Sequence, residues 1–209
     1  LFPYTTLFRS ILHDMTFTLT SFIFILILAP LTGLAGGFFR RFFQWAEKNQ
    51  TKSKSILWQL PAIALMTGLV AYFFPEIMGN GRSLAQFAIN SQQMHLVVVL
   101  VCGALLKVII TVLTIRAGAA GGTLTPSIAV GSALGAVLVL LLNFFLPGVS
   151  VGQGAILGAG TLLAASQQAP FMAMFMLIEI THLNYSALLP LALGIIISSA
   201  VSRKVLSKS

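Results

Sequence analysis

Residues 121–135 read GGTLTPSIAVGSALG, a glycine pair and a proline that open an apolar helix. The first N–H groups of a helix have no partners inside it, and that end carries roughly half a positive charge. Glycine lets a ligand approach the backbone closely, and proline suits a first helical turn because its missing N–H would be unpaired there. The stretch therefore predicts an anion site without a basic side chain. Its candidate residues are Gly122, Thr123, Leu124, Thr125 and Pro126.

The same residues are also compatible with an ordinary glycine-rich turn before a standard helix start. The motif alone favours this ordinary turn over an anion site. A site built from backbone N–H groups would nevertheless suit transport, which needs binding that is weak enough to release the ion. A fixed positive charge would hold an anion too tightly for that purpose.

Composition places this helix in a membrane. The chain is 57% hydrophobic and 8% charged, and it has only four acids. A soluble domain carries about 25% charged residues, so this chain cannot cover a water-facing surface. The sequence therefore predicts an all-α polytopic membrane protein, with the lipid bilayer as its surroundings.

Apolar segments of two lengths follow one another along the chain. A spanning helix needs about 20 apolar residues. We expect long helices over residues 17–45 (interrupted by Pro30 and the Gly36-Gly37 pair), 56–74, 96–115 and 124–146, and short ones over 83–92, 155–166 and 171–180. A last helix follows over 187–201. Broken helices at membrane depth are tolerated where they line a cavity or pack inside protein, and transporters use their ends at substrate sites. Small residues in 155–166 would permit close helix contact.

The net charge of +8 comes from basic residues at the ends of apolar segments. We place the loop after residue 41 and the C-terminal tail in the cytoplasm, because cytoplasmic loops are rich in Lys and Arg. This topology explains the charge better than nucleic-acid binding, which we do not expect. The residues concerned are Arg40, Arg41, Lys48, Lys52, Lys54, Arg203, Lys204 and Lys208.

Two charged residues fall inside apolar helices. An ionisable residue there suggests function by default. Lys107 has apolar helix neighbours, so we expect it to find a carbonyl or acid partner or to reach an interface. Glu179 would pair with backbone N–H groups near a helix end or with Thr181. We assign both residues a structural role.

No enzyme, metal or cofactor signature is present. Cys102 is the only cysteine, which excludes a disulfide within the chain and a cysteine-based metal site. His95 and His182 have no third ligand at metal spacing. We find no nucleophile, carboxylate pair or phosphate loop, and we therefore expect neither an enzyme nor a bound cofactor.

GGTLTPSIAVGSALG is similar to the Gly-x-Phe-x-Pro motif and following helix of the chloride channel (CLC) family. Further stretches agree in order: Gly79-Asn80-Gly81, Lys107, residues 157–181 (LGAGTLLAASQQAPFMAMFMLIEIT) and the C-terminal tail. The first of these resembles the turn before a short re-entrant helix of the family, and residues 157–181 resemble a stretch that ends in Glu-Met-Thr. The likeness covers about residues 18–204 and is greatest to small bacterial members.

This resemblance implies one inverted-repeat half of a CLC fold, with broken and re-entrant helices. It implies that backbone N–H groups of Thr123 and Leu124, beside Gly122, hold a central chloride. It also implies a homodimer of the intact protein in a bacterial inner membrane. Leu124 stands where the family usually has Phe, and Ala117 stands where Ser is frequent, so pore width and selectivity are open.

The resemblance also implies that several motifs of the family lie outside this chain. The family's Gly-Ser-Gly-x-Pro and Gly-x-Glu-x-Pro motifs belong to the other half, and a C-terminal tyrosine would follow Ser209. We therefore expect no transport by this chain alone. Whether the intact protein is a channel or a proton-coupled exchanger would depend on glutamates outside this chain.

Residues 1–10 (LFPYTTLFRS) look like a translated sequencing adapter, which leaves 11–209 as a single transmembrane domain. The alternatives are an unrelated broken-helix secondary transporter and a membrane fragment without transport.

Overall fold

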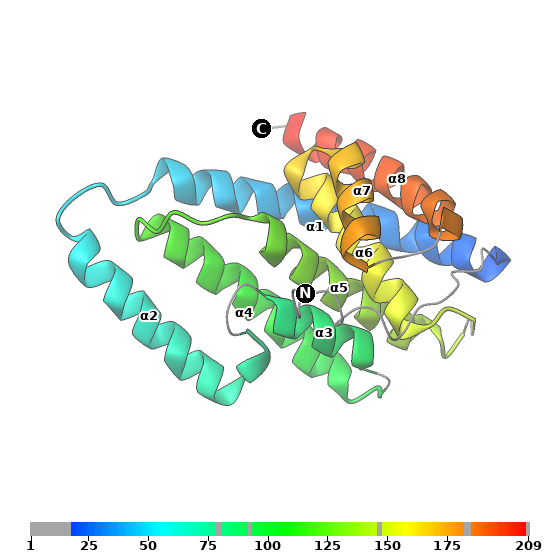
Figure 1. The fold of residues 1–209 in the computed structure, drawn as a ribbon, viewed down its shortest axis with the longest axis horizontal. Coiled ribbons are helices and arrows are strands. Elements are labelled where there is room, and N and C mark those ends of the chain that lie inside the picture. Colours follow the sequence, from blue (N-terminus) through cyan, green and yellow to red (C-terminus); the bar gives the residue numbers. More distant parts are fainter. Residues whose placement is uncertain (1–17, 78–80, 92, 146–147, 182–184, 208–209) are drawn as a thin grey trace.

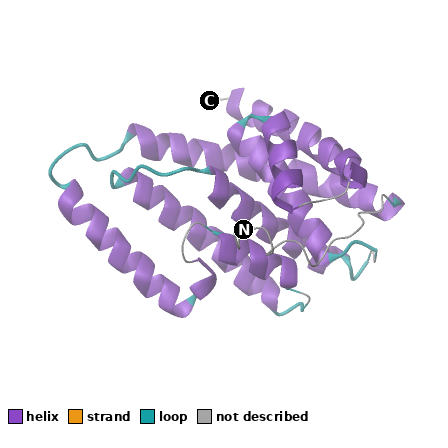
Figure 2. Ribbon diagram, viewed as in Figure 1, coloured by secondary structure: helices purple, strands orange, loops and turns teal. Residues whose placement is uncertain are grey.

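The computed structural model describes residues 18–77, 81–91, 93–145, 148–181 and 185–207, and every regular element in this part is helical (Figures 1 and 2). The predictions for residues 1–10, Gly79, Asn80, His182 and Lys208 lie outside these ranges. The elements in chain order are α1 (Leu19–Lys48), α2 (Ile56–Phe73), η1 (Pro75–Ile77), α3 (Arg82–Asn90), α4 (Leu96–Arg116), α5 (Leu124–Leu142), α6 (Val151–Gln167), α7 (Pro170–Thr181), η2 (Tyr185–Ala187) and α8 (Leu188–Ser207).

Five of these helices, α1, α2, α4, α5 and α8, are long and apolar enough to cross a membrane. The helix α3 has 9 residues and α7 has 12, which is too short to span a bilayer core. The predicted combination of long and short apolar helices is therefore confirmed.

Four helices begin or end at residues clearly different from the sequence-based expectation. The helix α1 continues through Pro30 without interruption and ends at Lys48. The helix α6 begins at Val151 rather than at 155, because Ser150 and Gln153 form a reciprocal capping box at its start. The helix α5 ends at Leu142 rather than at 146, and α8 continues to Ser207 rather than 201.

The centre of the fold is α6, in which every residue except Gln153 and Gln167 is buried. Glycines let α5 cross α6 at close range: a Cβ added at Gly131 or Gly135 would collide with the carbonyl of Gly158 or Gly154. The predicted close contact through small residues is confirmed, and its partner is α5.

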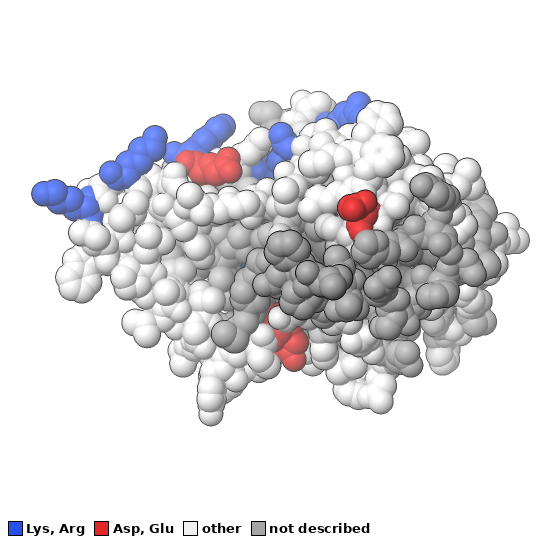
Figure 3. Space-filling model, viewed as in Figure 1, with Lys and Arg blue, Asp and Glu red and all other residues white. Residues whose placement is uncertain are grey.

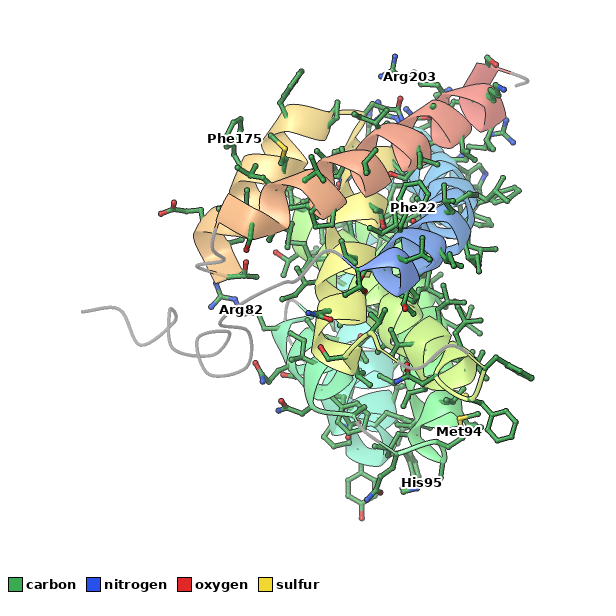
Figure 4. The ribbon with its side chains drawn as sticks, turned by 90° about the vertical axis from the view of Figure 1, so that its right-hand side faces the viewer. Phe22, Arg82, Met94, His95, Phe175 and Arg203 are labelled. Atoms are coloured by element: carbon green, nitrogen blue, oxygen red, sulfur yellow. The ribbon has the colours of Figure 1, made fainter. Side chains whose placement is uncertain are left out.

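The basic residues lie on one side of the molecule. Figure 3 shows Lys and Arg side chains along the upper edge of the visible face, over the end of α1, the α1–α2 loop and the end of α8. Figure 4 places Arg203 at this upper end and Met94 and His95 at the opposite end. Two basic segments on the same side fit the assignment of both to the cytoplasm.

The helix α2 stands apart from the other helices (Figure 1). Only Ala71 of its 18 residues is buried, although the helix is apolar throughout. Its exposed apolar side chains include Leu57, Leu65 and Leu69. The space between α2 and α4 is where the candidate site lies.

Candidate functional site

Gly118 ends α4 and turns the chain toward α5. Its φ is +105°, a left-handed conformation that glycine adopts without strain. The N–H of Gly118 donates to the carbonyl of Ile115, and the N–H of Ala119 donates to that of Thr114. These two bonds form a Schellman motif, which satisfies the last carbonyls of α4. The small-residue run after α4 is therefore a defined helix end.

Thr123 is the N-cap residue of α5, but its side chain makes no capping bond. Instead, its hydroxyl oxygen accepts a hydrogen bond from the amide Nε2 of Gln167 at 2.9 Å. Within the described residues, no backbone carbonyl accepts from the N–H groups of Thr123, Leu124 or Thr125. Pro126 has no N–H to satisfy. The first turn of α5 thus begins with open backbone donors.

A cavity of about 1010 Å³ lies against this turn. Three segments form its wall: one face of α2, the middle and end of α4, and the start of α5. The lining residues are Leu60, Pro61, Ile63, Ala64, Thr67, Lys107, Ile110, Thr111, Thr114, Gly121, Gly122, Leu124, Thr125 and Pro126. An apolar cavity with a few polar groups is the usual form of a small-ligand site.

The polar groups of the cavity wall differ in what they can donate. The hydroxyls of Thr67, Thr111 and Thr114 donate to carbonyls of their own helices at 2.7–2.8 Å, so their protons are already used. Lys107 is 4% exposed and brings a positive charge to the wall. The backbone N–H groups of the α5 start are therefore the open donors on this wall, and Lys107 lines it beside them.

The predicted site residues separate into two sets. Gly122, Leu124, Thr125 and Pro126 line the cavity together with Lys107. A Cβ added at Gly121 or Gly122 would meet no atom within 4 Å, so both glycines face open space. Thr123 instead lines a smaller cavity of about 190 Å³ on its other side, with Arg40 and Gln167 among its neighbours.

Glu179 lies away from this site. It is exposed on α7 and is not among the residues that line the large cavity. Its carboxylate therefore contributes nothing to the charge of the cavity wall.

A chain of polar side chains at the end of α6 was not anticipated from the sequence. Ser166 donates to the hydroxyl of Ser127 at 2.9 Å, and Ser127 donates to the carbonyl of Thr123 at 2.7 Å. Arg40 donates to the carbonyl of Ser166 at 2.9 Å. These bonds hold the first turn of α5 against α6 and α1.

The polar stripe of Lys107, Thr111 and Thr114 was also missed. Residues spaced by three and four lie on the same face of a helix. This spacing on an otherwise apolar helix is the signal that would have found it.

Comparison with known proteins gives one consistent result. A family model described as voltage gated chloride channel matches residues 1–203. The voltage-gated ClC-type chloride channel ClcB of Salmonella typhi is 28% identical over 204 residues, which cover 93% of this chain and 48% of that protein. ClcB of Salmonella typhimurium is 31% identical over 182 residues, which cover 82% and 42%.

Solved structures agree on the fold. A slow cyanobacterial Cl⁻/H⁺ antiporter matches with a TM-score of 0.75 and 25% identity, over 94% of this chain and 47% of that one. A CLC-type fluoride/proton antiporter matches with a TM-score of 0.73 and 23% identity, over 94% and 48%. The chain spans about half the length of the relatives that it matches.

Proposed function

Because this chain belongs to the voltage-gated chloride channel family, we propose that it supplies a chloride site to an anion-transporting membrane protein. The family consists of channels and transporters rather than enzymes. Membership also removes the alternative of an unrelated broken-helix transporter. The chain is accordingly an integral membrane protein, and its bacterial relatives support a bacterial inner membrane as its location.

One observation carries the proposal. The start of α5 presents N–H groups without acceptors among the described residues, and it does so at the wall of a cavity that spanning helices line. An anion that enters the cavity loses hydration water, and the N–H groups replace part of that shell. The aligned peptides of α5 add a favourable potential at the same point.

Lys107 modifies this mechanism. Its charge lies on the same cavity wall, so an anion at the start of α5 experiences both the helix dipole and a cation. The two together raise occupancy of the anion at this point. We propose that Lys107 both packs in the wall, as its burial indicates, and attracts the anion.

Chloride is the proposed ion. Two proteins of similar fold are named as a Cl⁻/H⁺ antiporter and a fluoride/proton antiporter, so a halide is the class to test. Of the described residues, the acids Glu47, Glu76 and Glu179 do not line the large cavity. This part of the chain therefore gives the cavity no carboxylate for proton coupling.

We also propose that the intact protein is a homodimer, as the family resemblance implies. The helix α7 exposes Phe171 and Phe175, and α8 exposes Leu189 and Ile196. Such apolar side chains fit either lipid or a second copy. Cysteine cross-linking between α7 helices in native membranes would separate the two, because only a dimer gives a covalent pair.

The direct test is halide flux from proteoliposomes that contain the whole protein. We expect chloride efflux, and we expect it to be lost when one residue is inserted after Gly122, which rotates the donors away from the cavity. A one-residue insertion between Lys52 and Ser53, in the exposed α1–α2 loop, is the control. Equal flux from both variants would show that the start of α5 is not the site.

A second proposal concerns the isolated chain. Its 209 residues correspond to about half of the related proteins, and α2 leaves its apolar faces uncovered. We therefore expect the isolated chain to insert in vesicles without carrying chloride. Chloride flux by the isolated chain would show that one half is sufficient.

A further inference from the structure

We propose that a groove between the α1–α2 loop and the end of α4 binds the headgroup of an anionic phospholipid. The groove has a volume of about 350 Å³ and is distinct from the large cavity. Its wall contains the polar side chains of Asn49, Thr51 and Gln59 together with the cation of Arg116. This site does not depend on the proposed transport function.

The loop is fixed near the end of α4 by one backbone N–H group and one side-chain amide. The N–H of Thr51 donates to the carbonyl of Arg116 at 2.9 Å, and Gln50 donates to the carbonyl of Ala119 at 3.4 Å. The Schellman motif at Gly118 satisfies the other terminal carbonyls of α4. The exposed helix end is thus capped by amides, which leaves the basic side chains available for another partner.

Arg116 is the centre of the groove. Its guanidinium lies 5.1 Å from the centroid of the Trp45 ring, a cation–π contact that holds it near an exposed aromatic side chain. Within the described part of the chain, no carboxylate forms an ion pair with it. A planar guanidinium presents paired N–H donors that match a phosphate.

Gln59 adds a second donor. Its amide oxygen accepts the hydroxyl proton of Thr51 at 2.7 Å, which turns the amide nitrogen toward other acceptors. No acceptor for that nitrogen is found among the described residues. The groove therefore presents a guanidinium and an amide on the same wall, which suits a phosphodiester.

The surroundings favour a lipid over a soluble phosphate. Lys48 is exposed at the end of α1, next to Glu47, and Lys52 and Lys54 are exposed on the loop. Figure 3 shows basic side chains gathered along this edge of the molecule. Trp45 and Trp58 are 47% and 83% exposed beside them. Exposed tryptophans mark the level of lipid headgroups, and basic clusters next to spanning helices attract anionic lipids. A soluble phosphate would bind the basic side chains but would not contact the exposed tryptophans beside them.

Quenching of Trp45 fluorescence by brominated lipids tests the site. The chain has two tryptophans, so a Trp58→Phe background leaves Trp45 as the reporter next to Arg116. The chain is reconstituted in phosphatidylcholine vesicles with increasing brominated phosphatidylglycerol or brominated phosphatidylcholine. We expect the anionic lipid to quench at a several-fold lower mole fraction.

Arg116→Gln is the test variant, and Arg203→Gln, which removes an exposed charge from α8, is its matched control. We expect Arg116→Gln to lower the relative affinity for the anionic lipid about fivefold and Arg203→Gln to leave it unchanged. Lys52 and Lys54 are exposed and do not line the groove. The double variant Lys52→Gln/Lys54→Gln should also lower the relative affinity for the anionic lipid.

Three results would overturn the proposal. One is equal quenching by the two lipids, and another is the same loss in the Arg116 and Arg203 variants, which would indicate general surface charge. The third is relief of quenching by millimolar glycerol phosphate, which would identify a site for soluble phosphates.

Discussion

Gln167 donates its amide N–H to the hydroxyl oxygen of Thr123 at 2.9 Å and so joins the last turn of α6 to the N-cap residue of α5. A threonine at the N-cap normally accepts a hydrogen bond from its own first turn. Thr123 accepts from Gln167 instead and caps nothing. Because Pro126 has no N–H, the N–H of Thr125 is the donor that Thr123 would otherwise take. Thr123 has helical dihedral angles, and the bond from Gln167 holds its hydroxyl toward α6, so that the N–H of Thr125 stays open.

Gln167→Leu should lower the affinity for the transported anion. Without the amide, the hydroxyl of Thr123 is free to accept the N–H of Thr125, and the anion loses one donor. A neutral hydrogen bond contributes about 0.5–1.5 kcal/mol, so we expect roughly a two- to tenfold loss. The measurement is chloride binding by isothermal titration with the purified whole protein.

Thr123→Val is the matched control for this prediction. Valine has nearly the same shape but no oxygen, so the first turn stays uncapped and anion affinity should stay near that of the wild type. The double variant should behave like Thr123→Val alone. If Thr123→Val weakens chloride binding as much as Gln167→Leu does, the effect comes from packing and not from competition for the N–H group.

Gly135→Ala and Gly122→Ala should affect stability very differently. A Cβ at Gly135 would overlap the backbone of Gly154, whereas a Cβ at Gly122 would meet nothing within 4 Å. Overpacking costs about 1–3 kcal/mol, while a substitution into open space stays within about 0.5 kcal/mol. The midpoint of thermal unfolding in detergent measures both. Equal midpoints would mean that α5 and α6 are not in close contact.

Lys107→Met should weaken chloride binding while the protein remains folded. Methionine fills a similar volume, so the wall is kept and the charge is lost. A charged hydrogen bond contributes about 1.5–3 kcal/mol, which corresponds to a loss of about tenfold or more. Chloride titration together with circular dichroism gives both readouts. A reduced unfolding midpoint with unchanged chloride affinity would assign Lys107 a structural role alone.

Arg40→Gln should destabilise the packing of α1 against the end of α6. Arg40 donates to the carbonyl of Ser166 near the end of α6, where a cation also interacts favourably with the helix dipole. Because the pair is only partly buried, we expect a loss of about 1 kcal/mol. Arg203→Gln removes an equal but exposed charge from α8 and should leave the unfolding midpoint unchanged. A similar decrease in both variants would point to net charge instead.

The sequence predicted the helical class because its composition leaves little choice. In lipid, backbone groups must be satisfied within the segment, and apolar stretches of this length do so as helices. It also located the start of α5 correctly, since the glycine pair, Thr123 and Pro126 are local signals. It misplaced the start of α6, although Ser150 and Gln153 show the spacing of a capping box.

Most residues of the cavity wall could not be predicted from the sequence. Local pattern indicated Gly122, Leu124 and Thr125, because they belong to one turn. It gave no reason to bring Lys107 or Thr67 to the same place, because both lie on other helices. Their meeting depends on how α2 and α4 pack beside α5.

The sequence by itself determined an all-helical membrane chain, the order of its apolar segments, and an α5 start with few satisfied N–H groups. These are properties of consecutive residues, set by backbone hydrogen bonding and by transfer from water to lipid. Only the tertiary structure decided that Gln167 takes the Thr123 hydroxyl and that Lys107 faces the same cavity as Gly122. Gln167 and Thr123 are 44 positions apart and meet because the glycines of α5 and α6 allow close approach. Lys107 and Gly122 line one cavity because α4 packs beside α5, and no local pattern encodes either arrangement.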